Sequence, residues 1–334
     1  MQVGANKMRI PGCVTLAFAL LFLALGASAN SQVLRSAKYS SGSAKEAEIW
    51  QTEVRAKLSG LLKMDDLLAN RKSIPLNPKE IRSENKEDYF LKVIELNSTA
   101  NRRIRVIATF PLLTQGPWPA VVCIHGHSGK PNSVYDKESI YKGFAAELAA
   151  RNYVTIAPVV SQHEVYEKGR TLMGERVWDA MRCVDYLESL NSVDATRIGC
   201  AGLSLGGEMA MWLGAMDVRV KATLSSGFLT RMDQMEQNHC MCWKFTGLRE
   251  LVDYADIYSL IAPRALLCQN GLQEPATGFT IELARAALKE IQVIYADCNK
   301  PENIHLVAHP EGHVMDLESL LPFFKAQLNP IKNS

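Results

Sequence analysis

A serine stands at the centre of Gly202-Leu-Ser204-Leu-Gly206, after a short apolar run and before a stretch with helical spacing. This pattern is typical of a serine nucleophile on a sharp turn between a strand and a helix. The turn crowds its neighbours, so the positions two before and two after the serine must lack a Cβ. A helix N-terminus also stabilises negative charge. The pattern predicts nucleophilic chemistry at Ser204, and the alternative is a glycine-rich turn with a solvated serine.

A serine nucleophile needs a general base, and a histidine near the C-terminus is the expected partner in the order Ser, acid, His. Three histidines lie late enough in the chain: His305, His309 and His313. His305 falls inside the last expected strand and His309 at its end. His313 follows in the loop after that strand, where catalytic groups gather, so we expect His313 to be the base.

The acid should follow the preceding expected strand, residues 265–269. Glu274 is the acidic residue of the loop that comes next. There it would accept a hydrogen bond from Nδ1 of His313 and stabilise the imidazolium form. Asp253 and Asp256 are the alternative acids, and an ordinary solvated carboxylate is the alternative role for Glu274.

The first strand of the alternating region ends in a glycine-rich loop, His125-Gly-His127-Ser-Gly129. Such a loop can aim a backbone N–H group at the carbonyl oxygen of a substrate. We expect the N–H groups of His127 and Leu205 to form an oxyanion hole, Leu205 being the residue after the nucleophile. The side chains of His125 and His127 are expected to brace the loop.

No metal and no other cofactor is expected. A zinc site at His125, His127 and His163 is the alternative, but the two histidines of the glycine-rich loop lack a well-spaced third and fourth ligand. Cys240 and Cys242 lie in the loop after the strand that ends at residue 225. They could form a disulfide or bind a metal with His239, but a structural role in the loop is the simpler interpretation.

The elements that would position these residues alternate between short apolar runs and amphipathic stretches. The expected strands are residues 120–124, 153–157, 197–201, 220–225, 265–269 and 304–308. The expected helices between and after them are residues 177–190, 208–216, 281–294 and 317–328. Continuous apolar strands that alternate with helices indicate an α/β fold with a mainly parallel central sheet and helices on both faces. Ligands on such sheets bind at the carboxyl ends of the strands.

The N-terminal segment has the three parts of a secretory signal. Lys7 and Arg9 precede an apolar run at residues 14–26, and small residues at 27–29 provide a cleavage pattern. Thirteen apolar residues are too few to span a bilayer comfortably, although an uncleaved anchor is the alternative. We therefore expect a signal peptide over residues 1–29, a secreted or periplasmic protein, and no stable membrane insertion after cleavage.

Residues 30–116 are expected to form an N-terminal extension, and residues 117–330 the catalytic domain. Within the extension we expect a linker and then a helix over 46–62. A polar loop over 71–88 and a β-hairpin of residues 90–95 and 103–110 would follow.

Composition excludes several classes of protein. The 334 residues are 47% hydrophobic and 22% charged, which is ordinary for a globular chain. The formal charge of +2 disappears with the two basic residues of the signal, so we expect no nucleic-acid partner. Eight scattered cysteines do not make a disulfide scaffold.

With these residues placed, the chain resembles the α/β-hydrolase superfamily, and within it the dienelactone-hydrolase-like and acetyl-xylan-esterase-like serine esterases. The resemblance is carried by residues 123–129, 169–179, 198–207, 261–267 and 309–313. It implies a Ser-acid-His triad at Ser204, Glu274 and His313, and ester hydrolysis through an acyl-enzyme. Two positions depart from the family pattern: the acid is usually aspartate, and Glu208 stands where a small residue is commoner.

The function that these observations predict is that of an exported serine carboxylesterase acting on a small-molecule or carbohydrate ester, such as an acetylated carbohydrate. One alternative is a serine peptidase of the prolyl-oligopeptidase type, but about 90 residues before the first core strand are too few for its propeller. The other is a non-catalytic binding protein on a hydrolase scaffold, against which the retained Ser204 and His313 argue.

Overall fold

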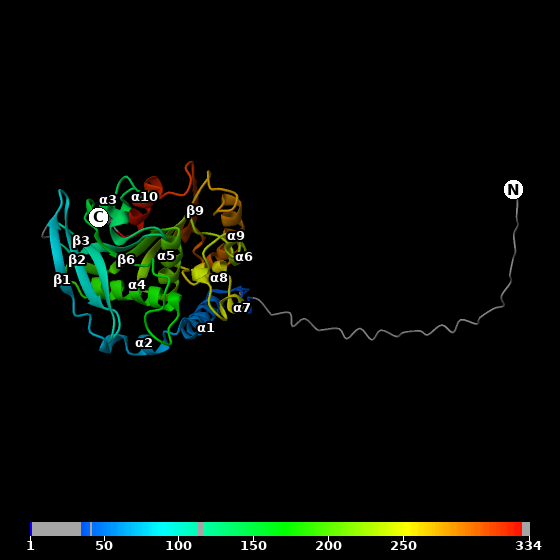
Figure 1. Cartoon of the computed structure of the whole chain (residues 1–334), viewed down its shortest axis with the longest axis horizontal. Helices are drawn as coiled ribbons and strands as arrows, with labels where there is room; N and C mark the ends of the chain where they lie inside the picture. The colour runs from blue at the N-terminus through cyan, green and yellow to red at the C-terminus, as the bar shows by residue number, and fades with distance from the viewer. Residues whose placement is uncertain (2–34, 41, 113–115, 329–334) are drawn as a thin grey trace. The chain divides into compact units, whose positions relative to one another are not determined.

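One sheet of nine strands forms the centre of the computed structural model, which describes Met1 and residues 35–40, 42–112 and 116–328 (Figure 1). The strands run in the order β1-β2-β3-β5-β4-β6-β7-β8-β9 across the sheet. Their bounds are β1 (Lys79–Asn85), β2 (Tyr89–Asn97), β3 (Arg103–Pro111), β4 (Trp118–Ile124), β5 (Val154–Pro158), β6 (Val193–Leu203), β7 (Val220–Ser226), β8 (Ala265–Gly271) and β9 (Ile304–His309).

The strands from β4 to β9 are parallel to one another, whereas β1, β2 and β3 form antiparallel pairs, the last of them between β3 and β5. The prediction of a mainly parallel sheet is therefore confirmed. Because parallel strands share a direction, the loops after β4, β5, β6, β7, β8 and β9 all leave the same edge of the sheet. Ser204, Glu274 and His313 all follow strands that end at this edge.

Helices cover both faces of the sheet, as predicted. The α-helices are α1 (Ala44–Leu62), α2 (Asp65–Ala69), α3 (Phe144–Ala149), α4 (Leu172–Glu188), α5 (Leu205–Met216), α6 (Met232–Met235), α7 (Leu248–Leu251), α8 (Tyr254–Ser259), α9 (Ile281–Asp297) and α10 (Leu317–Leu328). Short 3-10 helices are η1 (Arg71–Ser73), η2 (Pro131–Tyr135), η3 (Met241–Trp243) and η4 (Pro301–Asn303). Alternate residues of β4 point to opposite faces: Val122 joins the core with α4, α5, α8 and α9, while Val121 joins the core with α3 and α10.

The segment before β4 differs from expectation in one element. The predicted hairpin is present as β2 and β3, but the region expected to be a polar loop contains β1, which pairs with β2. All seven residues of β1 are exposed, so no apolar alternation marks the strand in the sequence. Charged side chains and a register shift between Glu80 and Arg82 suit an edge strand, since both discourage pairing with another chain. Through β3 and β5 this segment continues the central sheet.

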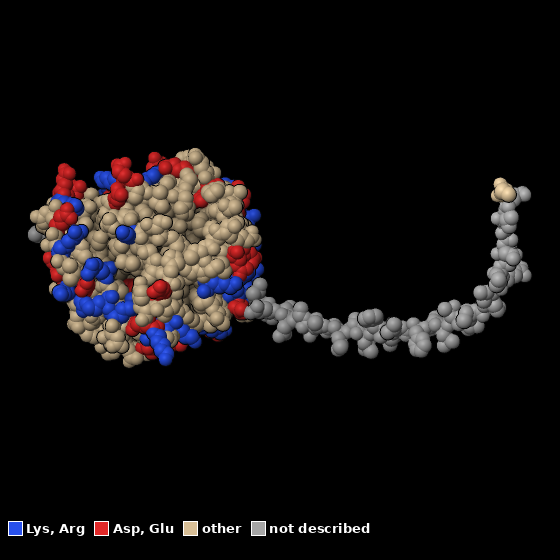
Figure 2. Space-filling model, viewed as in Figure 1, with Lys and Arg blue, Asp and Glu red and all other residues tan. Residues whose placement is uncertain are grey.

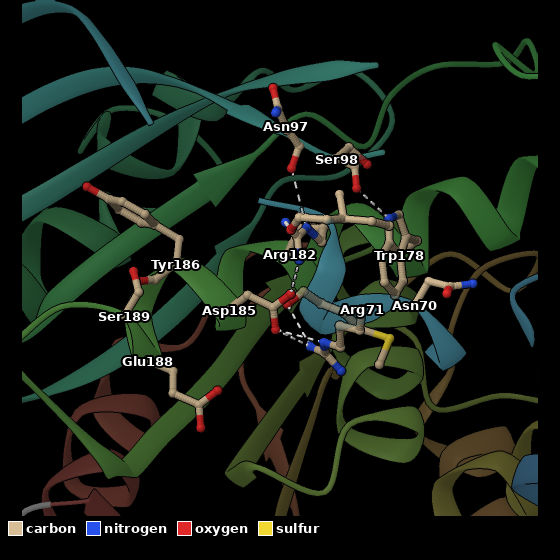
Figure 3. Close-up of polar contacts among 12 residues, drawn as sticks. Asn70, Arg71, Asn97, Ser98, Trp178, Arg182, Asp185, Tyr186, Glu188 and Ser189 are labelled. Atoms are coloured by element: carbon tan, nitrogen blue, oxygen red, sulfur yellow. Dashed lines mark hydrogen bonds and ion pairs between the residues drawn. The ribbon is translucent and has the colours of Figure 1, made fainter. Parts of the chain in front are cut away.

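Helix α4 joins the antiparallel part of the sheet to the parallel part (Figure 3). Trp178 donates from Nε1 to the carbonyl oxygen of Ser98 at 2.8 Å, and Arg182 donates from Nε to that of Asn97 at 3.3 Å. Both acceptors lie at the end of the β2–β3 hairpin. The guanidinium groups of Arg182 and Arg71 also lie 5.7 and 5.8 Å from the Trp178 ring centroid. The N-terminal segment is thus bound to the helix that begins near the candidate active site.

The expected signal peptide, residues 1–29, lies outside the described residues except for Met1 and remains a prediction. Among the helices of the described part of the chain, none is both long enough and apolar enough to cross a membrane. On the face shown in Figure 2, side chains of both signs surround a mostly uncharged centre.

Candidate active site

Ser204 occupies a strained turn between β6 and α5. Its backbone has φ 63° and ψ −126°, a conformation that residues with a Cβ rarely adopt. The Ser204 N–H donates to the carbonyl oxygen of Ser226 at 2.9 Å, which ties the turn to the end of β7. Strain of this kind costs about 1–3 kcal/mol and persists where the surroundings hold it, most often at functional sites. The turn has the geometry of a nucleophile elbow.

The glycines on either side of Ser204 are required by close backbone contacts. A Cβ on Gly202 would lie 2.1 Å from the carbonyl oxygen of Gly206, and one on Gly206 would lie 2.2 Å from that of Ile124. Neither contact could be relieved by moving a side chain, because both atoms belong to the backbone. The Gly-x-Ser-x-Gly spacing is therefore explained by sterics in this structure.

The structure brings Glu274 and His313 together. His313 Nδ1 lies 2.6 Å from Glu274 Oε1, and the Glu274 side chain is 3% exposed. The two loops that carry these residues are joined by further hydrogen bonds, since Gln273 donates from its backbone N–H to the carbonyl oxygen of Glu311 at 3.0 Å and from Nε2 to that of Pro310 at 2.7 Å. Because a carboxylate only accepts, Nδ1 of His313 carries the proton and Nε2 is free to act as a base.

The His313 ring lies beside the end of β7, next to the Ser204 turn. A Cβ on Gly227 would meet Cε1 of His313 at 2.8 Å and Cδ1 of Leu203 at 3.2 Å. Phe279 stacks on the ring with a centroid distance of 5.6 Å. Within the described part of the chain, Ser204 Oγ makes no hydrogen bond to His313, a contact that often forms only when substrate binds.

The alternative acids have other partners. Asp253 and Asp256 form the N-terminal capping box of α8, with Asp253 accepting from the N–H of Tyr254 at 2.6 Å and Asp256 from the N–H of Asp253 at 2.9 Å. Asp256 also pairs with Arg35 at 2.6 Å. These carboxylates stabilise a helix end, whereas Glu274 faces the histidine.

The glycine-rich loop after β4 lies directly against Ser204. A Cβ on Gly126 would be 3.2 Å from Cβ of Ser204. His125 is buried and braces this loop as expected: its Nδ1 lies 2.8 Å from the carbonyl oxygen of Gly126, and its Nε2 accepts from the N–H of Val160 at 3.3 Å. The N–H of His127 has no hydrogen-bond partner among the described residues.

Leu205 is the first residue of α5, so its N–H is one of those that no intrahelical carbonyl can satisfy. The amides of His127 and Leu205 thus belong to the two loops that meet at Ser204. Their assignment as an oxyanion hole is compatible with this placement and stays a prediction. The His127 side chain differs from the expectation, because it faces a cysteine and makes no bracing contact within its own loop.

A cavity of about 150 Å³ opens beside the nucleophile. Its lining combines apolar and aromatic side chains with polar and ionisable ones, and comprises His127, Ser204, Leu205, Glu208, Phe228, Met235, Asn238, His239, Cys240, Cys242, Trp243 and Phe279. The loop between β7 and α8 supplies about half of these residues, a contribution that the pattern of strand ends could not indicate.

Two buried ionisable residues belong to the surroundings of the site: Glu208 lines the cavity, and Arg176 contacts Cys242 of the lining. The sequence did not give either a role in the site. Glu208 is 1% exposed, and its Oε1 has no partner among the described groups. Burial raises the pKa of Glu208 to about 8, although the nearby Arg176 guanidinium opposes the shift. Arg176 is fully buried on α4 and donates to the carbonyl oxygen of Gln162 and to Sγ of Cys242. The only sequence signal was the unusual glutamate at position 208.

Four potential metal ligands gather at the mouth of the cavity. They are His127, His163, Cys240 and Cys242. Each offers one ligand atom, and these four atoms all lie within 4.8 Å of one another. Burial lowers the pKa of His127 to about 4, and nearby cationic groups add to the shift. His127 is therefore neutral near pH 7. The sequence suggested two separate candidate sets instead: His127 and His163 with His125, and Cys240 and Cys242 with His239.

Comparisons with known proteins agree with this geometry. A family model described as "Glucuronyl esterase, fungi" matches residues 94–228, a range that includes the nucleophile turn and the glycine-rich loop. A protein of Bacillus subtilis (strain 168) described as a hydrolase, YtaP, is 25% identical over 268 residues, which cover 72% of this chain and 87% of that protein.

Solved structures share the fold. A protein of Bacteroides fragilis NCTC 9343 assigned as an acetyl xylan esterase superposes with a TM-score of 0.72 at 17% identity, covering 88% of this chain and 91% of that one. A glucuronoyl esterase from Solibacter usitatus gives 0.66 at 15% identity, with 89% and 97% covered. The chain is therefore an ester-hydrolysing enzyme of the α/β-hydrolase type.

Proposed function

We propose that Ser204, His313 and Glu274 form the catalytic triad of a serine carboxylesterase. The observation that carries this proposal is the 2.6 Å contact between His313 Nδ1 and Glu274 Oε1, made beside a strained serine turn. The contact fixes the imidazole tautomer in which Nε2 has the free lone pair. A histidine held in this way is what a serine hydroxyl needs in order to become nucleophilic.

In the proposed reaction, Nε2 of His313 takes the proton of Ser204 Oγ as this oxygen attacks the carbonyl carbon of the ester. The N–H groups of His127 and Leu205 donate to the oxyanion of the tetrahedral intermediate. His313 then gives its proton to the departing alcohol, which leaves an acyl group on Ser204. Water attacks the acyl-enzyme with His313 again as base, and the acid product leaves.

We infer a carbohydrate ester with a small acyl group as the substrate. The carbohydrate part rests on the relatives, which are named as esterases of glucuronoyl and acetyl xylan substrates. The small acyl group rests on the cavity beside Ser204, whose volume of about 150 Å³ leaves room for a group of acetyl size. The buried Arg176 lies behind this lining, so the cavity offers little exposed positive charge to a carboxylate.

A substrate panel tests this proposal. Acetylated xylan, feruloyl esters and methyl-glucuronoyl esters are compared with wild-type enzyme and the Ser204→Ala variant. We expect release of acetate by the wild type alone. Preferred cleavage of the glucuronoyl ester would contradict the small-acyl assignment, while equal turnover by both proteins would contradict the triad.

We further propose that the protein is exported and loses residues 1–29. The basic residues Lys7 and Arg9, the apolar run and the small residues at 27–29 support this. Sequencing the N-terminus of the protein recovered from the culture medium or periplasm tests it. A first residue near position 30 is expected, and recovery only in the cytoplasm with an intact N-terminus would contradict export.

A further inference from the structure

Three separate loops bring cysteine and histidine side chains together at the mouth of the cavity. His127 belongs to the loop after β4, His163 to the loop after β5, and Cys240 and Cys242 to the segment between β7 and α8. We propose that these four side chains bind one Zn²⁺ ion. Two thiolates and two imidazoles are a ligand set that zinc prefers, and the ion would join three loops that secondary structure does not connect.

The spacing of the ligand atoms fits a tetrahedral ion. With Zn–S bonds of about 2.3 Å and Zn–N bonds of about 2.0–2.1 Å, tetrahedral ligand atoms lie about 3.3–3.8 Å apart. The four atoms here all lie within 4.8 Å of one another, and His127 Nε2 is 3.1 Å from Cys242 Sγ. The rings of His127 and His163 have a centroid distance of 5.5 Å. Small side-chain movements would bring the ligand atoms to tetrahedral spacing.

Neighbouring groups orient two of the ligands as a metal site requires. His163 Nδ1 lies 3.0 Å from the carbonyl oxygen of Ser161, so Nδ1 carries the proton and Nε2 is left as a free donor of electrons. Metal-bound histidines almost always make such a contact through the other ring nitrogen. Arg176 donates from Nη1 to Sγ of Cys242 at 3.4 Å, a contact that holds this ligand atom in position.

Four protein ligands leave no open position on the ion, so the proposed zinc is structural and has no part in the reaction. Its effect would be on the loops. The backbone N–H of His127 is one of the two proposed oxyanion-hole donors, and coordination of its side chain would hold that loop in place. Cys240 and Cys242 would likewise fix the loop that supplies much of the cavity lining.

Two residues from the earlier zinc hypotheses do not belong to the cluster. His125 points away from it, with both ring nitrogens hydrogen-bonded to the backbone. His239 stacks on Phe279 with a centroid distance of 5.2 Å. The expectation of a metal-free protein rested on the lack of a well-spaced third and fourth ligand for the His125 and His127 pair. In the structure, His163, Cys240 and Cys242 lie near His127 instead.

The test is the metal content of the full chain. The purified protein is incubated with Zn²⁺ and dialysed against metal-free buffer, and its zinc content is then measured by elemental mass spectrometry. We expect about one zinc per chain, bound with a Kd on the order of 10⁻⁸ M or tighter. Cys242→Ser and His163→Ala should each lose most of the metal. Cys298→Ser and His305→Ala change a cysteine and a histidine outside the cluster, and should retain it.

Cobalt provides a second measurement that does not depend on a variant's yield. The wild-type protein loaded with Co²⁺ should show the visible absorption of a tetrahedral ion and a thiolate charge-transfer band, and Cys242→Ser should lose the latter. Two results would overturn the proposal: wild-type protein that retains no zinc after loading, or a Cys240–Cys242 disulfide in freshly purified, unreduced protein. Both experiments measure metal binding and not turnover. The zinc proposal can therefore fail while the esterase assignment holds, and the reverse is also true.

Discussion

Two groups of side chains meet at the carboxyl edge of the sheet, and they are held in different ways. The triad group of Ser204, Glu274 and His313 sits one to four residues beyond strand ends, in short connections that backbone hydrogen bonds join to one another. The cysteine–histidine group lies farther out, with Cys240 and Cys242 in the long segment between β7 and α8. The sheet positions the first group, whereas the second needs something to bind its loops together.

We therefore expect the triad group to determine turnover and the cysteine–histidine group to determine the stability of the loops. Changes in the triad group should abolish turnover and leave folding nearly intact. Changes in the cysteine–histidine group should release the metal and loosen the loops while leaving much of the chemistry. The following predictions test that separation, beginning with the largest effect.

Replacing the nucleophile should have the greatest effect. We expect Ser204→Ala to lower kcat by about 10⁴- to 10⁶-fold, because no other group can form the acyl-enzyme. The melting temperature should stay the same. Hydrolysis of a short-chain nitrophenyl ester measures the first quantity and calorimetry the second. Ser226→Ala is the matched control, since its neighbouring hydroxyl has no hydrogen-bond partner in the described structure, and it should remain active.

The acid comes next. Glu274→Gln should lower kcat by up to about 10⁴-fold, because the amide can favour the wrong tautomer of His313. Asp253→Asn is the informative comparison. Because asparagine also caps helices well, this variant should keep both its folding stability and its kcat near wild type. If Asp253→Asn lost most of its kcat while Glu274→Gln stayed active, the catalytic acid would be Asp253 and not Glu274.

Gly227 tests the position of the base. Gly227→Ala would place a methyl group 2.8 Å from Cε1 of His313, so the ring must move, and we expect kcat to fall by about 10²-fold. Gly169→Ala is the control for backbone strain. Gly169 also has a positive φ of 86°, but a Cβ there would meet open space. Equal losses of activity in the two variants would show that strain, and not the contact with His313, is responsible.

Removing the proposed metal should have a smaller effect on turnover than any change in the triad. We expect Cys242→Ser to lower the melting temperature and to reduce kcat by less than about tenfold, because the oxyanion loop loses its support but keeps its backbone donors. Cys298→Ser should match the wild type in both measurements. A loss of kcat as large as that of Ser204→Ala would mean that the two groups do not act separately.

For Glu208 the prediction concerns folding stability, which should depend on pH. The folded-state pKa of about 8 lies above the ordinary value near 4.5, so the folded protein binds the proton more tightly than the unfolded chain. This contribution to stability is complete below about pH 4.5 and falls as pH rises towards 8, by up to about 1.4 kcal/mol per pH unit. Urea denaturation at about pH 5 and about pH 8 measures this change. Between these two values the free energy of unfolding should fall less in Glu208→Gln than in the wild type. The exposed Glu282→Gln should behave as wild type.

The fold and the triad candidates could be predicted from sequence because both depend on strand ends. Each apolar run of the core became a strand of the parallel sheet, and its carboxyl end located Ser204, Glu274 and His313. Strand β1 could not be predicted, because its residues are all exposed and backbone pairing with β2 alone creates it.

The cysteine–histidine group could not be predicted for a different reason. Sequence spacing separates Cys242 from His127 by more than one hundred residues, and only the conformation of three loops brings their side chains to 3.1 Å. The sequence contained the correct residue types, but each candidate set included a histidine that lies outside the cluster: His125 in one and His239 in the other. Glu208 illustrates the same limit, since its burial follows from the packing of α5 against α4 and α8.

The central claim is that Ser204 is the nucleophile activated by His313. A fluorophosphonate probe tests it most directly, with intact mass and peptide mapping as the readout. We predict one adduct per chain on Ser204 in the wild type, none in Ser204→Ala, and strongly slowed labelling in His313→Ala. Labelling at another residue, or full esterase turnover by Ser204→Ala, would contradict the account.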